Sequence, residues 1–138
     1  MNETLLSPAS QTTAGILLLT IVAVESGGIY LLSVVRGRHP LTDFQKAFAR
    51  AGHAHAGVLV TLALVCQIMV DSSELTGFAA TVARSGVPLA AVLMPAGFFF
   101  SSTGKEVTRP NRLIVLVYAG AAALAAGVVA LGLGLLVT

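Results

Sequence analysis

Three residues whose side chains can do chemistry lie inside or at the edge of long apolar stretches: Glu25, His53 and His55. Carboxyl and imidazole groups bind metal ions and exchange protons, and they are rare in apolar segments because burying them is costly. Their presence there predicts a functional role, either at a bound cofactor or along a proton path. Which role is favoured depends on the elements that position them.

The two histidines are expected to point to different faces of the helix and to contact different neighbours. His53 and His55 are two residues apart, so at about 100° per residue they point to nearly opposite faces of a helix and do not easily share one metal ion. His55 continues a line with Phe44 and Phe48, which predicts the more apolar, packed face. His53 follows Arg50 on a face that starts among charged residues.

Small residues surround both imidazoles: Gly52, Ala54, Ala56 and Gly57. A flat macrocycle needs small side chains around an axial histidine in order to approach the helix that carries it. Close helix packing, with each imidazole hydrogen-bonded to a neighbour, needs the same small side chains. The residues alone leave these two interpretations on equal terms.

Glu25 lies near the middle of the first apolar stretch, where an unpaired carboxylate is costly, so we expect it to be protonated or partnered. With Arg36 and Arg50 as markers, Glu25 lies about 16 Å deep and His55 about 7 Å, at ~1.5 Å per residue. A direct Glu25–His55 bond is therefore not expected unless the second span begins lower, near Lys46. A Ser or Thr of another helix, or a water, is the expected partner.

The composition indicates an integral membrane protein. Of 138 residues, 56% are hydrophobic and 10% charged, whereas soluble domains carry about a quarter charged residues. Four apolar stretches, each long enough to cross a ~30 Å hydrocarbon layer, cover about residues 14–35, 47–70, 79–101 and 113–137. Backbone groups in lipid must bond within their segment, so these stretches are predicted helices. We expect one all-α domain over residues 1–138, a four-helix bundle in the lipid bilayer with no nucleic-acid footprint.

Basic residues set the expected orientation. Seven of the eight Lys and Arg residues lie in or beside the links between the first and second and between the third and fourth stretches, and only Arg84 lies on the other side. Cytoplasmic loops carry the excess of Lys and Arg, so both links are predicted to be cytoplasmic and both termini to lie on the non-cytoplasmic side. The residues before the first stretch include neither Lys nor Arg, so a retained helix is expected there and not a signal peptide.

The third stretch ends in Phe98, Phe99 and Phe100, on the same side as the start of the second. We expect these rings to line an apolar substrate pocket beside the histidines, with Thr61 in its wall and Glu25 as its acid. The more ordinary role for such a run is core packing and anchoring at the membrane interface.

Small residues recur at every fourth position along the last stretch, from Ala122 to Gly134. Such a stripe lets helix backbones approach closely, so this face is predicted to pack tightly. The sequence leaves open whether it packs inside one bundle or against another copy.

Several short motifs taken together resemble styrene oxide isomerase. The chain has Gly27-Gly28 late in the first stretch, Arg50-Ala51 followed by His55-Ala56-Gly57 in the second, and Pro110-Asn111-Arg112 before the fourth. The likeness covers most of the chain in topology and rests on these short motifs.

This resemblance implies a multi-pass protein of the bacterial inner (cytoplasmic) membrane, a homo-oligomer (a trimer) that binds haem b at the subunit interface. In that family the ferric iron acts as a Lewis acid on an epoxide oxygen, and a 1,2-shift gives an aldehyde, so a small apolar epoxide is the implied ligand. Matched by motif, the axial ligand falls on His55, with His53 as the fallback. Arg50 or His53 would pair with a haem propionate, and Gly57 and Thr61 belong to the same cofactor site.

The chain also departs from that family. The isomerases carry an asparagine on the second span and aspartate and tyrosine on the third, whereas this chain has Thr61 on the second and none of these on the third. Two other classes stay open. One is a small proton-linked transporter or channel in which Glu25 and the histidines relay protons. The other is an accessory subunit of a membrane complex that uses its small-residue faces for packing.

Overall fold

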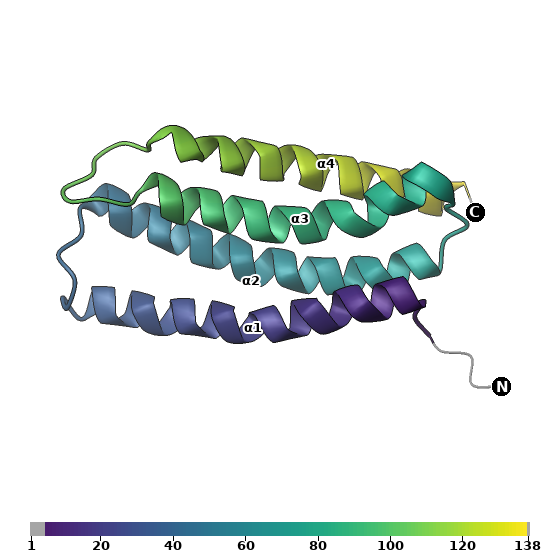
Figure 1. Ribbon diagram of the computed structural model, residues 1–138, viewed down its shortest axis with the longest axis horizontal. Helices are drawn as coiled ribbons and strands as arrows, with labels where there is room; N and C mark the ends of the chain where they lie inside the picture. Colours follow the sequence, from purple (N-terminus) through teal and green to yellow (C-terminus); the bar gives the residue numbers. More distant parts are fainter. Residues whose placement is uncertain (1–4, 138) are drawn as a thin grey trace.

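The computed structural model describes residues 5–137, and these form an all-helical chain (Figure 1). The elements are α1 (Pro8–Val35), α2 (Asp43–Asp71), α3 (Gly77–Ser101), the 3₁₀ turn η1 (Arg112–Ile114) and α4 (Val115–Leu136). Four helices, the last counted from Arg112, are long and apolar enough to cross a membrane. The prediction of an all-α chain with four long apolar helices is confirmed.

Two helices begin earlier than the apolar stretches predict, because capping sets their first turns. The hydroxyl of Ser7 caps α1 by accepting from the first-turn backbone at 3.3 Å, and Pro8 suits the first helical position. α2 begins at Asp43 behind a capping box, in which Thr42 and Gln45 bond each other's backbone. The start of α2 therefore lies about one turn before the predicted position 47.

The helices follow one another in chain order: α1 packs mainly on α2, and α3 packs on both α2 and α4. In Figure 1 the α1–α2 and α3–α4 links lie at one end, here called the link end, and the α2–α3 link and the termini lie at the other, the terminal end. The core lies between α2, α3 and α4, and its fully buried members include Ala63, Ala83, Val87 and Ala90. α1 adds Leu17 to this core. It is the outermost helix, with most of its surface uncovered.

α3 and α4 approach closely where two glycines face each other. A Cβ on Gly86 would lie 2.6 Å from the Cα of Gly127, and a Cβ on Gly127 would lie 2.9 Å from the Cα of Gly86. These distances are shorter than real Cβ contacts, so only glycine at both positions allows this approach.

The packed face of α4 differs from the stripe that the sequence predicts. Ala122 and Ala126 are exposed. The buried small residues are Gly120, Gly127 and Gly134, spaced seven apart. Inside this chain the prediction is correct at Gly134, which is buried, and in part at Ala130, which packs against the core half-buried. Packing of the exposed alanines against another copy stays a prediction.

α3 runs as one helix through Pro88 and Pro95. Proline has no amide hydrogen, so the carbonyl of Arg84, four residues before Pro88, loses its helical donor. The buried side-chain amide of Gln67, in α2, donates to this carbonyl at 3.0 Å. A neighbouring helix thus replaces the donor that Pro88 removes from α3.

The glycine contact can be tested by Gly127→Leu, with Gly132→Leu as the matched control. A side chain at position 127 meets the α3 backbone, whereas one at position 132 meets nothing within 4 Å. We expect Gly127→Leu to lower the free energy of unfolding by about 1–3 kcal/mol through overpacking, and Gly132→Leu to leave it nearly unchanged. Thermal unfolding in detergent, followed by circular dichroism, measures both. Equal effects would contradict the contact.

Candidate functional site

The two histidines lie on opposite flanks of α2. His53 faces α1, where it contacts Gly27 and Gly28. His55 faces the other way and contacts Phe98 of α3, with ring centroids 5.0 Å apart. Both side chains are half-buried. Each histidine therefore has its own surroundings, as their spacing predicts.

His55 has one ring nitrogen engaged and one free. Its Nδ1 lies 2.7 Å from the carbonyl oxygen of Ala51, one turn earlier in α2. A backbone carbonyl only accepts, so Nδ1 carries the proton and donates, and Nε2 of the neutral ring keeps its lone pair. Among residues 5–137, Nε2 has no hydrogen-bond partner. A metal-ligating histidine is commonly oriented in this way, through the nitrogen that does not touch the metal.

Aromatic rings hold His55 on its other side. Phe98 packs edge-on against Phe48 with a centroid distance of 5.4 Å, and Phe48 packs on Phe44 at 4.2 Å. This row of rings runs from the link end to His55. The predicted line of His55 with the two α2 phenylalanines is present, and α3 adds one ring to it.

His53 fits into a notch that two glycines leave in α1. A Cβ on Gly27 would lie 3.2 Å from the His53 Nδ1, and a Cβ on Gly28 would lie 3.5 Å from Nε2. Both ring nitrogens therefore lie close to the backbone of α1. A Cβ at position 27 would require His53 to shift by a few tenths of an ångström, whereas a Cβ at position 28 would make an ordinary contact.

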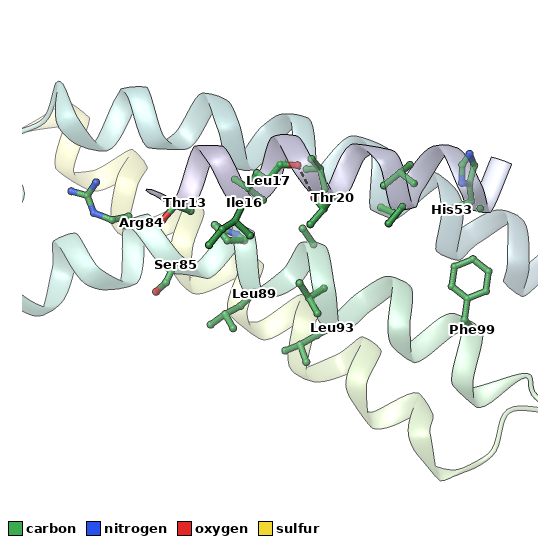
Figure 2. Close-up of a pocket in the computed structure, with 18 of the residues that line it drawn as sticks. Thr13, Ile16, Leu17, Thr20, His53, Arg84, Ser85, Leu89, Leu93 and Phe99 are labelled. Atoms are coloured by element: carbon green, nitrogen blue, oxygen red, sulfur yellow. Dashed lines mark hydrogen bonds between the residues drawn. The ribbon is translucent and has the colours of Figure 1, made fainter. Parts of the chain in front are cut away.

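A groove of about 800 Å³ extends from His53 along the α1 side of the molecule (Figure 2). α1 and α3 form its walls and α2 its floor. Phe99 lies across the groove from His53, and Arg84 lies at the far end. The lining is mostly aliphatic, and the hydroxyls of Thr20 and Ser85 each donate to a carbonyl of their own helix at 2.6 Å. The groove thus offers an apolar space with polar groups at its two ends.

A polar cluster at the terminal end holds α1 against α2 and α3. Asp71 accepts from Arg84 at 2.8 Å and from the backbone nitrogen and hydroxyl of Ser7 at 2.7 and 3.0 Å. Arg84 also donates to the hydroxyl of Ser10, which is fully buried. Sequence reasoning did not single out this cluster. The available signal was a lone arginine in an apolar stretch, which needs a counter-ion nearby.

This cluster predicts that removing the charge of Arg84 lowers the stability of the protein more than removing the charge of Lys46. Arg84→Met leaves the largely buried Asp71 carboxylate without its counter-ion, so we expect the free energy of unfolding to fall by about 1–3 kcal/mol. Lys46→Met removes an exposed ion pair with Asp43, which should cost less than about 0.5 kcal/mol. Urea unfolding in mild detergent gives both values. If the arginine variant is no less stable than the lysine variant, the cluster does not hold α1.

Other predicted site residues lie away from His55. Arg50 is exposed and borders a smaller pocket at the link end, together with Lys46 and His39. Thr61 is exposed and donates to the carbonyl of Gly57 in its own helix at 3.0 Å. Neither Arg50 nor Thr61 is brought beside the ring of His55 within this chain.

The three consecutive phenylalanines of α3 lie in three different surroundings. Phe98 lies beside His55, and Phe99 lies in the groove with His53. Phe100 is exposed. Successive residues of a helix are about 100° apart, so a run of three cannot line one pocket. The chain therefore has two separate aromatic surroundings, one for each histidine.

Glu25 is exposed. It precedes Gly27 and Gly28, which both contact α2, by about 200° and 300° around the helix, so it lies to one side of the contact face. The depth difference expected from the sequence is wrong, because α2 begins at Asp43 and His53 lies level with Gly27 and Gly28. Two residues nearer the terminal end on each helix, Glu25 precedes Gly27 and His55 follows His53, so these two residues share one level. They still lie on faces that point away from each other.

Comparisons of this chain with protein-family models, with curated proteins and with solved structures give no significant match.

Proposed function

We propose that this chain is a multi-pass protein of the bacterial cytoplasmic membrane that binds haem b through His55. The observation that carries the proposal is the 2.7 Å contact of the His55 Nδ1 with the Ala51 carbonyl, which leaves Nε2 free as an axial ligand. One histidine is enough to hold a haem iron. The described residues contain no group of three or more His, Cys, Asp or Glu side chains that could hold a bare metal ion. A macrocycle with a single protein ligand therefore suits this chain better than a multi-ligand metal site.

The geometry favours His55 over His53 as the ligand. The His53 ring lies against the backbone of α1, with both nitrogens close to Gly27 and Gly28. His55 has no such neighbour in its own chain, and Phe98 offers an aromatic face beside it. The fallback ligand thus becomes a packing residue, and the cofactor site moves to the flank of α2 away from α1.

A bound ferric haem would supply a Lewis acid, which in styrene oxide isomerase opens an epoxide to an aldehyde. In this chain His55 would hold the iron, and the ring of Phe98 beside it would keep water away from an apolar ligand. Arg50 and His53 lie on other faces of α2, so any pairing with a propionate would involve another subunit. We propose a small apolar epoxide as ligand and a homo-oligomer, a trimer by resemblance, as the assembly.

The four apolar helices and the link-end basic residues support the proposed membrane orientation. Both basic links lie at the same end of the molecule (Figure 1). An excess of Lys and Arg at one end is the usual mark of the cytoplasmic side, so the termini would lie outside. The resemblance to a bacterial family supplies the choice of membrane.

The alternative of a proton relay has less support from the geometry. Glu25, His53 and His55 lie on three different surfaces, and no hydrogen bond joins any two of them among the described residues. A relay through one copy would need such a connection. An accessory role in a larger complex stays a prediction, based on the uncovered surfaces of α1 and α4.

The haem proposal predicts a coloured protein whose colour depends on one histidine. Protein purified from cells supplied with haem precursor, or reconstituted with hemin, should show a Soret absorption band. We expect His55→Ala to lose at least nine-tenths of this band at equal protein, because the axial ligand is gone. Added imidazole should restore part of it by filling the vacated position.

His53→Ala and His39→Ala are the matched controls and should keep the band. Loss of the band in His53→Ala alone would move the site to the groove. A colourless wild-type protein that takes up no hemin would overturn the proposal and favour the relay, which Glu25→Gln would then test by proton flux in liposomes. For the enzymatic part, conversion of styrene oxide to an aldehyde should be measured on the haem-loaded protein.

A further inference from the structure

The groove between α1, α2 and α3 is not used by the proposed haem site, which lies on the other flank of α2. The volume of the groove, about 800 Å³, lies within the range of roughly 300–1,000 Å³ that small-molecule sites occupy. Such sites are mostly apolar and carry a few polar groups that orient the ligand. The groove has this composition, so the groups at its ends indicate what kind of ligand it binds.

The groove offers no uncompensated charge to a ligand. Arg84 is the only Asp, Glu, Lys or Arg residue in its described lining, and it is paired with Asp71 at 2.8 Å. The threonine and serine hydroxyls of the lining all donate to carbonyls of their own helices. An ionic head group would therefore find no free counter-ion here, and a neutral head group is favoured.

His53 supplies the polar group at the end of the groove nearer the link end. Its ring makes no hydrogen bond among residues 5–137. A neutral imidazole has one N–H donor and one acceptor nitrogen, and both are costly to leave unpaired in apolar surroundings. A Cβ at position 27 would lie 3.2 Å from the His53 Nδ1, and Gly27 itself lines the groove. This glycine therefore leaves room beside Nδ1 for an atom of a ligand.

Two aromatic rings border the groove at this end. Phe99 of α3 lies across the groove from His53 (Figure 2). Gly52 lets the Phe99 ring lie close to α2, because a Cβ at position 52 would lie 2.9 Å from a carbon of that ring. Aromatic rings make favourable stacked or edge-on contacts with other flat conjugated groups. A planar head group is therefore favoured between them.

The remainder of the groove is long enough for an extended hydrocarbon tail. Thr13 and Gly27 both line it from α1, and the fourteen residues from one to the other span about 21 Å at ~1.5 Å per residue. One leaflet of a ~30 Å hydrocarbon layer is only about 15 Å deep. A phospholipid chain that enters from the link end would thus stop before the groove ends, which favours a longer tail.

We propose that the groove binds a lipid-soluble quinone, a neutral flat ring with carbonyl oxygens and a long isoprenoid tail. One ring carbonyl accepts a hydrogen bond from His53, the ring lies beside Phe99, and the tail follows α1 and α3 towards Arg84. This site lies on the flank of α2 that faces α1, so it requires neither the Nε2 of His55 nor a second copy. It goes beyond the proposed haem function and does not depend on it.

The test is the binding of trimethyl-decyl-benzoquinone to the purified protein in detergent, measured by isothermal titration calorimetry. Trimethyl-decylbenzene is the matched probe, since it has the same tail and a flat ring but no carbonyl. We expect the quinone to bind at one site per chain and the carbonyl-free probe to bind about tenfold more weakly, because one hydrogen bond is lost. Equal affinities of the two probes would mean that the groove takes any hydrocarbon, and the proposal would then be wrong.

Three pairs of variants locate the site. His53→Leu should weaken quinone binding about tenfold, whereas His53→Gln keeps an N–H donor and should retain most of the affinity. Gly27→Ala fills the space beside Nδ1 and should weaken binding several-fold, whereas Gly28→Ala lies outside the groove lining and should not. Ala56→Leu narrows the floor of the groove and should also weaken binding. Ala54→Leu adds the same side chain at an exposed position outside the groove and should leave the affinity unchanged.

Circular dichroism and size-exclusion chromatography first establish that each variant is folded, and the comparison of the two probes needs no variant. A wild-type protein that does not bind the quinone contradicts the site, and so does equal affinity in wild type, His53→Leu and Ala56→Leu. His55→Ala should bind the quinone as wild type does, and loss of binding in that variant would place the ligand on the other flank. A colourless protein that binds the quinone contradicts only the haem site, and a coloured protein that does not bind it contradicts only the groove site.

Discussion

The position of α1 depends on how closely its backbone approaches one imidazole. Gly27 and Gly28 leave a notch that His53 fills, and the notch sets the level of α1 along α2. Two further contacts hold the same helix nearer the terminal end. One is the polar cluster at Asp71, and the other is the packing of Leu17 in the core. Between these contacts α1 stands away from α3, and the groove of about 800 Å³ lies in the space that remains. One contact of small residues thus sets both the groove and the level of Glu25.

The same contact separates two histidines that are neighbours in the sequence. His53 packs against the backbone of α1 and borders the groove. His55 is oriented by a backbone carbonyl and keeps a free nitrogen. A polar atom in apolar surroundings gains when an external ligand supplies its partner. For this reason the cofactor is proposed on the flank of His55.

Much of the fold could be predicted from the sequence, because four apolar stretches with polar links leave few other choices. The errors arose where contacts between helices decide the outcome. The stripe from Ala122 to Gly134 has a regular period, yet glycines seven apart give a closer approach to α3. The depth of His55 depended on where α2 begins, and the capping box at Thr42 sets that start. The opposite directions of the histidines followed from helical geometry alone. Which of the two histidines packs against α1 could not be predicted without the position of that helix.

Gln67 has a consequence for how the chain is made. The carbonyl that Pro88 leaves without a donor is satisfied only when α2 lies beside α3, since the amide of Gln67 comes from that helix. In the proposed membrane location, α3 alone would carry an open backbone acceptor into hydrocarbon, which is unfavourable. α2 and α3 are joined by the five residues from 72 to 76. In a membrane they would therefore be expected to insert together as one hairpin.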